Sequence, residues 1–376
     1  MKPIYLDYNA TTPISKEVAD AMRPYLDVYF GNPSSSHFYG MQTKQAVEKA
    51  RKQIARMLNC QASEIVFTSG GTESNNYAIK GIALANKEKG NHIITSSIEH
   101  PAVIEVCKYL EQQGFEITYI PVDNQGLVDT TEVEKAIKPT TILISIMHAN
   151  NEVGSIQAIA EIGAVAKKHG VIMHTDAAQS LGKIKADVQA MNVDLLSVAG
   201  HKLYAPKGIG ALYIRKGIAL EKLIHGADHE RNLRAGTENV LEIVGLGKAC
   251  EVANNNLEEN AKHYQTMRDY FHNILQESLP QIRLNGPKDK RLPNTLNISF
   301  PKIEANTLIA KMPGIAASAG AACHSSGISV SQVIKAMGIP VDYAMGTIRF
   351  STGRYNTKDQ LKIAANMVIM AVKELT

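Results

Sequence analysis

The sequence predicts an α/β protein in which a mostly parallel β-sheet is covered by helices on both faces, followed by a smaller α+β domain. Three observations lead to this prediction. Between about residues 64 and 215, short apolar and β-branched runs alternate with longer stretches of helical periodicity, as parallel sheets with helical connections require. Beyond residue 215 this alternation stops. The chain of 376 residues also exceeds the roughly 250–300 at which a single hydrophobic core stops growing.

The elements of the first domain follow from residue type and spacing. Its strands are short runs rich in Ile, Val and Thr, and its helices repeat apolar residues every three or four positions. Strands are predicted at residues 64–68, 92–96, 116–120, 141–147, 171–175, 194–198 and 210–214, and helices at 73–87, 102–113, 131–138 and 159–170.

The second domain has a different order of elements. The sequence predicts a long helical stretch over 238–278, a strand at 294–300, helical segments at 304–311 and 329–337, a strand at 347–351 and an amphipathic helix from Thr357. The N-terminal arm is free to join these elements. We therefore expect a large domain of residues 13–255 and a small domain of residues 1–12 and 256–376.

The composition restricts the partners and the compartment. A net charge of +4, from 40 basic and 36 acidic residues, argues against nucleic acid as a partner. The chain starts without an apolar signal region, and no window approaches the ~20 apolar residues that span a bilayer, so we expect a cytoplasmic protein without membrane contact. Four widely spaced cysteines without a CxxC pair indicate neither a disulfide framework nor a structural metal site, and no metal is expected.

The first candidate site is TSGGTESNN, which follows a predicted strand and opens a helix. In open α/β sheets, ligands collect beyond the carboxyl ends of the strands. The amides of Gly71 and Thr72 and the Thr72 hydroxyl would face an anion at the positive helix end, and a phosphate is the natural ligand. A turn in which Thr72 merely caps the helix is the alternative. The spacing is not G-x-G-x-x-G, which argues against a dinucleotide.

Asp176 and Lys202 also end apolar strands. Taken alone, the aspartate is typical of a helix cap and the lysine of a surface residue. Together with a phosphate-binding helix end, they form the minimum set for pyridoxal phosphate: an anchor for the phosphate, a carboxylate that keeps the ring nitrogen protonated, and an amine for the aldehyde. Desolvation would lower the pKa of Lys202 and favour its neutral, nucleophilic form.

Cys323 lies in SAGAACHSSGISV, a run of small residues without an apolar face. An exposed thiol on such a glycine-bounded loop is typical of a nucleophile that must move. The adjacent His324 could exchange a proton with it, although neighbouring side chains often point apart. The other cysteines, Cys60, Cys107 and Cys250, have apolar neighbours and are expected in the core.

Arg349 and Arg354 lie near the end of the last predicted strand, TIRFS. A guanidinium suits a substrate carboxylate, which it binds with two parallel hydrogen bonds. A solvated salt bridge is the alternative, more so for Arg354 than for Arg349, which is flanked by Ile348 and Phe350.

Ten motifs, in order along nearly the whole chain, resemble the landmarks of the pyridoxal phosphate-dependent cysteine desulfurases and the closely related selenocysteine lyases. They are YLDYNATTP, GNPSS, TSGGTESNN, EHPAV, MHANNEVG, HTDAAQSLGK, GHKLYAPKGIGALY, RAGTENV, SAGAACHS and IRFSTGR. The resemblance implies fold type I of the pyridoxal phosphate enzymes. It places a mostly parallel, seven-stranded sheet in the large, cofactor-binding domain and the active cysteine loop in the small domain.

The resemblance also implies roles for individual residues. Lys202 would bind the cofactor aldehyde covalently, Asp176 would pair with the pyridinium nitrogen and Gln179 would bond the phenolic oxygen. His100 would stack on the ring and assist proton transfer, whereas EHP by itself reads as a helix start with proline at its first position. Ala199 departs from the family, which commonly has a serine there, so a hydroxyl contact to the phosphate is missing.

The remaining roles concern the phosphate, the substrate and the sulfur. The phosphate would be held by four residues: Gly71, Thr72, His201 and the partner's Thr237. Because a partner subunit supplies one of them, the resemblance implies a homodimer. Asn151, beside the cofactor, and Arg349 would position the substrate amino acid, and Cys323 would accept the sulfur. Apart from the resemblance, the segments around Asn151 and Thr237 read as a turn and a loop.

The implied reaction removes sulfur from L-cysteine and gives L-alanine and a persulfide on Cys323. The persulfide would pass to a protein acceptor, as in iron-sulfur cluster assembly, tRNA thiolation or selenophosphate synthesis. A selenocysteine lyase acting on L-selenocysteine is the nearest alternative, because the Ala-Ala-Cys-His-Ser run resembles that branch as well. An aminotransferase would need no mobile cysteine, and a catalytically idle sulfur-carrier or scaffold subunit would not need Lys202 and Asp176.

Overall fold

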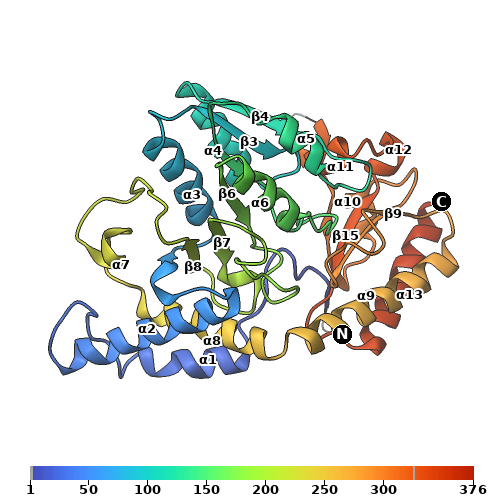
Figure 1. Cartoon of the computed structure of the whole chain (residues 1–376). Helices are drawn as coiled ribbons and strands as arrows, with labels where there is room; N and C mark the ends of the chain where they lie inside the picture. The colour runs from blue at the N-terminus through green and yellow to red at the C-terminus, as the bar shows by residue number, and fades with distance from the viewer. Residues whose placement is uncertain (1–2, 325–326) are drawn as a thin grey trace.

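The computed structural model describes residues 3–324 and 327–376, with the side chains of 321–329 left out. Its centre is a seven-stranded sheet (Figure 1). From edge to edge its strands are β2 (Ile65–Thr68), β8 (Gly210–Ile214), β7 (Leu195–Ala199), β6 (Ile172–Asp176), β5 (Thr141–Ser145), β3 (His92–Ser96) and β4 (Glu116–Ile120). Strand β8 is antiparallel to both of its neighbours, and the other adjacent pairs are parallel. The predicted mostly parallel sheet is therefore confirmed.

Helices cover both faces of this sheet (Figure 1). They are α2 (Phe38–Leu58), α3 (Gly71–Ala85), α4 (Pro101–Gln112), α5 (Thr130–Lys135), α6 (Ile159–Lys168) and α8 (Val240–Asn255). Successive strand residues point to opposite faces. Ile93 and Leu195 thus pack in one apolar cluster with α3 and α4, whereas Ile94 and Leu196 pack in another with α2, α6 and α8.

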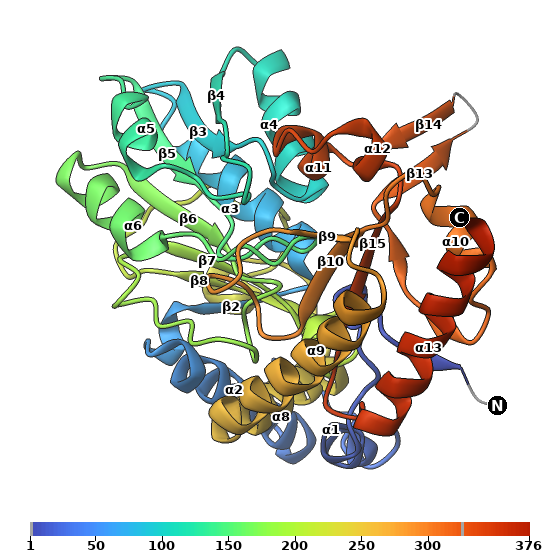
Figure 2. The same ribbon diagram turned by 90° about the vertical axis from the view of Figure 1, so that its right-hand side faces the viewer.

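A second, four-stranded antiparallel sheet lies beside the first (Figure 2). Its order is β12 (Ser318–Ala319), β15 (Thr347–Ser351), β10 (Thr295–Ser299) and β9 (Arg283–Asn285). The helices α9 (Leu257–Ser278), α10 (Ala305–Ala310) and α13 (Lys358–Leu375) share its apolar cluster. The N-terminal strand β1 (Ile4–Tyr5) pairs with β11 (Ile315–Ala316), so the N-terminal arm joins this part of the molecule. The division of the chain after residues 12 and 255 stays a prediction.

Short elements complete the described part of the chain. They are α1 (Lys16–Met22), α7 (His229–Asn232), α11 (Gln332–Ala336), α12 (Val341–Ala344) and the 3-10 turns η1 (Arg23–Tyr25), η2 (Ala62–Glu64) and η3 (Gly200–Lys202). Within the described ranges, no helix combines the length and the apolar character needed to cross a bilayer.

Two predicted segments differ from the structure. The helical stretch 238–278 is two helices, because Asn256 takes a non-helical conformation between α8 and α9 and its side chain bonds back to the carbonyl of Val252 at 2.8 Å. The helix expected at 329–337 is shorter, because residues 327–330 instead form a strand. That strand, β14 (Gly327–Val330), pairs with β13 (Ala321–His324), so the expected cysteine loop contains a hairpin that aligns the backbones of Cys323 and Ile328.

Candidate active site

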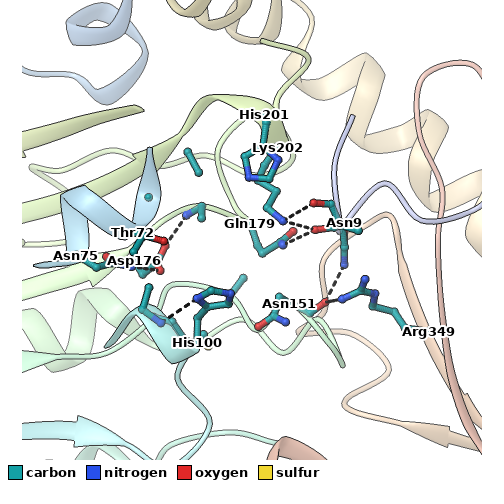
Figure 3. Close-up of a pocket in the computed structure, with 17 residues that line it drawn as sticks. Asn9, Thr72, Asn75, His100, Asn151, Asp176, Gln179, His201, Lys202 and Arg349 are labelled. Atoms are coloured by element: carbon teal, nitrogen blue, oxygen red, sulfur yellow. Dashed lines mark hydrogen bonds between the residues drawn. The ribbon is translucent and has the colours of Figure 1, made fainter. Parts of the chain in front are cut away.

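A cavity of about 350 Å³ lies where β6 and β7 end and α3 begins (Figure 3). Most of the predicted site residues line it: Gly71, Thr72, His100, Asn151, Asp176, Gln179, His201, Lys202 and Arg349. The sequence therefore locates the cavity through residues that are distant along the chain but meet at the carboxyl ends of the strands, as open α/β sheets dictate.

The amino end of α3 opens into this cavity. The helix begins at Gly71 and is preceded by Gly70, whose φ of +151° places the turn in a conformation that favours glycine. Thr72 is thus the second helical residue, and the alternative in which it caps the helix is wrong. Among the described side chains none caps this end, so its amides are free for an anion. A Cβ on Gly71 would come within 3.2 Å of the Ala199 methyl group, so this end of the cavity is narrow.

Asp176 is the last residue of β6, and its carboxylate is fixed from two sides. Oδ2 accepts a hydrogen bond from Nδ2 of Asn75 at 2.7 Å, and Oδ1 accepts one from the amide of Ala178 at 2.8 Å. The carboxylate is buried but lines the cavity. It can therefore face a cationic ring nitrogen without reorganising. It does not cap a helix, because the residues that follow it form a turn.

Lys202 ends the 3-10 turn η3 after β7, and its amine is held over the cavity. Nζ donates to the carbonyls of Asn9 and Ala10, each at 2.7 Å. Burial, with a smaller contribution from the positive charge of Arg349, lowers the pKa of Lys202 to about 8. The pKa of Lys202 is thus lowered, as predicted. An amine with this pKa is partly neutral and nucleophilic near neutral pH.

His100 is the N-cap of α4, with Pro101 at the first helical position, as the EHP motif predicts. Its Nδ1 accepts a hydrogen bond from the amide of Ala102 at 3.1 Å. Burial lowers the pKa of His100, Asp176 opposes that shift and Lys202 adds to it. A neutral ring whose Nδ1 accepts carries its proton on Nε2, so it is a hydrogen-bond donor there.

Arg349 projects from β15 and is buried. Nη1 donates to the carbonyl of Asn151 at 2.9 Å, and Nη2 donates to Oδ1 of Asp7 at 2.8 Å and to the hydroxyl of Ser318 at 2.9 Å. The pair with Asp7 is largely shielded, with 10% and 18% of the side chains exposed, so the solvated salt bridge is excluded for Arg349. A guanidinium fixed in this way can present an anion site to the cavity.

Four predicted residues are not among those that line this cavity. Thr237 is exposed and lines a separate, smaller cavity with Ser69 and Gly208. Arg354 stacks its guanidinium 4.3 Å over the ring of Tyr204 and does not line the main cavity. The side chains of Cys323 and His324 lie outside the described residues.

Two of the remaining cysteines lie in the core, as predicted, and the third is half-buried at its margin. Cys107 and Cys250 are fully buried, and Cys60 packs against the apolar cluster on the α2 face. Burial raises the pKa of each thiol to about 12. These three thiols are therefore poor nucleophiles at neutral pH.

Two residues of the site carry no role in the sequence prediction. Asn9 and Asn75 are both almost fully buried and line the cavity. Both stand inside motifs of the resemblance, YLDYNATTP and TSGGTESNN. An asparagine in such a motif is a weak signal, because only the structure shows that the Asn9 backbone carbonyl accepts from Lys202 and that the Asn75 side chain donates to Asp176.

These groups fit pyridoxal phosphate. The cavity is large enough for a small cofactor, the free amides of α3 suit its phosphate, and Asp176 and Lys202 suit its ring nitrogen and its aldehyde. The α/β fold and this donor set together define an enzyme of the pyridoxal phosphate-dependent class.

Comparisons with known proteins agree. The family model described as Aminotransferase class-V matches residues 4–363. The "Cysteine desulfurase IscS" of Dictyoglomus turgidum is 48% identical over 376 residues, which cover 100% of this chain and 95% of that protein. A solved structure described as "NIFS-LIKE PROTEIN" superposes with a TM-score of 0.93 at 38% identity and covers 99% of this chain and 100% of its own. Another, "SspA in complex with cysteine", has a TM-score of 0.83 at 40% identity and covers 94% of this chain and 99% of its own. The chain belongs to the cysteine desulfurase family.

Proposed function

We propose that this protein removes sulfur from L-cysteine, releases L-alanine and keeps the sulfur as a persulfide on Cys323. The observation that carries the proposal is the cavity itself, which places the amine of Lys202, the carboxylate of Asp176 and the guanidinium of Arg349 around one small-molecule space. The similarity to a structure solved in complex with cysteine supports the choice of substrate.

Different residues of the chain carry out the separate steps of the reaction. Arg349 binds the substrate carboxylate, and the Lys202 amine, with a pKa of about 8, takes the proton from the substrate α-carbon. Pyridoxal phosphate, when bound, withdraws electrons from that carbon. The Cys323 thiolate then attacks the substrate sulfur, so a sulfur-sulfur bond forms as the carbon-sulfur bond breaks and the electron pair stays on carbon. Nε2–H of His100 can protonate the β-carbon that has lost the sulfur, and the Lys202 ammonium returns its proton to the α-carbon, giving L-alanine.

The same groups allow a second substrate. L-selenocysteine presents the same carboxylate and amine, and the Ala-Ala-Cys-His-Ser run resembles the selenocysteine lyase branch. The relatives described as cysteine desulfurases support L-cysteine first. Transfer of the persulfide to a protein acceptor in the cytoplasm, such as an iron-sulfur scaffold, belongs to this proposal and is supported by the motif resemblance.

A homodimer also belongs to this proposal. Thr237 is exposed and lies outside the cavity of its own chain, so it is available to a second copy. An exposed apolar patch lies between α1 and the first turns of α2: Leu26, Val28, Phe30, Phe38, Tyr39 and Met41. The rings of Phe30 and Tyr39 stack in this patch with their centroids 5.3 Å apart. Exposed apolar patches of this kind are typical of protein–protein interfaces.

The test compares the two substrates with and without the acceptor thiol. Purified protein supplied with pyridoxal phosphate should release L-alanine from L-cysteine and acquire a persulfide on the peptide that contains Cys323. The Cys323→Ala variant should bind the cofactor normally and form no L-alanine from L-cysteine. Undiminished sulfide release by that variant would remove Cys323 from the mechanism, and turnover of L-selenocysteine alone would assign the protein to the lyases.

A further inference from the structure

Lys183 is a buried amine that the proposed reaction does not use. Lys183 is 5% exposed and lies four residues after Gln179, in the turn that follows β6. Nζ donates to Oε1 of Gln179 at 2.8 Å and to Oδ1 of Asn9 at 3.0 Å. No carboxylate pairs with Lys183 among the residues that the structure describes, and Lys202 and Arg349 add further positive charge nearby. A buried amine without a counter-ion is costly to keep, so its presence calls for a physical role.

Lys183 fixes the direction of the Gln179 amide. Nζ of Lys183 donates to the Gln179 carbonyl oxygen, and the other end of the amide faces the Asn9 backbone carbonyl, which can only accept, so the amide has one orientation. The amide nitrogen then points the other way, where Nε2 donates one hydrogen to the carbonyl of Asn9 at 3.0 Å. Gln179 lines the cavity, so its second N–H is free for a ligand there.

The same amine fixes Asn9. Oδ1 of Asn9 accepts from Lys183 and also from Nδ2 of Asn294 at 2.9 Å, so the side-chain amide of Asn9 cannot turn over. Its Nδ2 donates to the hydroxyl of Thr295 at 2.8 Å. The backbone carbonyl of this residue accepts from both Gln179 and Lys202 (Figure 3). Lys183 is therefore one hydrogen bond away from two groups that face the cavity.

We propose that Lys183 is a positioning residue for the cofactor, which holds the Gln179 amide so that its free N–H meets the phenolic oxygen of pyridoxal phosphate. The inference rests on the proposed placement of the cofactor in the cavity. Lys183 does not touch the substrate or the reacting atoms. It acts through Gln179 and Asn9, and a purely structural lysine would affect the stability of the fold without affecting the cofactor.

The first measurement is cofactor binding. Apoprotein carrying Lys183→Met, which keeps the length of the side chain but cannot donate, is titrated with pyridoxal phosphate while the absorption spectrum is recorded. We expect Kd to rise about tenfold or more and the absorption band of the bound cofactor to shift, because the bond to the phenolic oxygen is lost for part of the time. Lys185→Met is the matched control, since Lys185 lies two residues away with 78% of its side chain exposed, and it should leave Kd and spectrum unchanged.

The second measurement asks whether Lys183 acts through Gln179. In a Gln179→Leu background the amide is absent, so adding Lys183→Met should raise Kd by a clearly smaller factor than it does in the unaltered protein, with only the contact to Asn9 left to lose. An equal factor in both backgrounds, or a Lys183→Met protein with the original Kd and spectrum, overturns the inference. If Lys183→Met does not fold, Lys183→Leu, which also cannot donate, is put through the same cycle with the same criteria. Failure of the unaltered protein to bind pyridoxal phosphate would instead overturn the proposed function.

Discussion

The reactivity of Lys202 should follow its lowered pKa. An amine reacts with an aldehyde only when it is neutral. With a pKa of about 8 instead of the ordinary 10.5, roughly a tenth of the Lys202 amine is neutral at pH 7, compared with about three parts in ten thousand for an ordinary lysine. Burial of the amine over the cavity therefore raises the reactive fraction about 300-fold. Since the pKa is lowered, this advantage is largest below pH 8 and disappears above pH 10.5.

The assay is the reconstitution of apoprotein with pyridoxal phosphate, followed by stopped-flow absorbance between pH 6 and pH 10. The rate should rise about tenfold per pH unit at the acid end, bend near pH 8 and then level off. Free Nα-acetyl-lysine is the reference and should continue to gain rate up to pH 10. A protein whose rate follows that of the free amino acid across the whole range refutes the assignment of a buried, nucleophilic amine.

Three other perturbations test the site and its support. Arg349→Gln should raise KM for L-cysteine about 10- to 150-fold with a smaller change in kcat, because a charge-assisted hydrogen bond to a carboxylate contributes about 1.5–3 kcal/mol. An unchanged KM in steady-state kinetics would contradict the role of Arg349 in binding the substrate carboxylate. Glu230→Gln should lower the free energy of unfolding, measured in urea titrations, by about 3–5 kcal/mol. The reason is that Arg51 and Glu230 form a buried ion pair in which each side chain is 3% exposed. A loss below about 1 kcal/mol would show that the pair behaves like a surface ion pair. Cys323→Ser should abolish formation of L-alanine from L-cysteine. The control Cys107→Ala removes a buried thiol with a pKa of about 12 and should leave the rate of L-alanine formation intact. Equal losses of activity in the two variants would point to lost protein stability as the cause.

The fold was predictable where apolar periodicity is unambiguous. Most strands of the large sheet are buried runs rich in branched residues, although the edge strand β4 is only partly buried, and β3, β4 and β8 match the predicted ranges at both ends. The junction of α8 and α9 could not be placed, because helical periodicity continues on both sides of Asn256 and neither Gly nor Pro marks the break. Helix α2 is predictable in principle, since its buried residues Val47, Ile54 and Leu58 recur at helical spacing.

The site was predictable where chemistry and position coincide. Asp176 ends a buried strand and Lys202 ends the short turn that follows one, and charged residues at such positions are unusual enough to indicate a ligand. The hydrogen-bond partners that hold the site residues in place were not predictable. Asn9 and Lys183 are 174 positions apart, and nothing in either residue type shows that they meet beneath the cavity. Contacts of this kind depend on how the N-terminal arm packs against the sheet, which sequence spacing does not encode.

The most direct test is to find which amine holds the cofactor. Reduction of the holoenzyme with borohydride makes the bond between pyridoxal phosphate and its lysine permanent, and peptide mass spectrometry then locates the added group. The label should appear on the peptide containing Lys202 and on no other. A label on Lys183, the other buried amine beside the site, or the absence of any labelled peptide, would contradict the central claim.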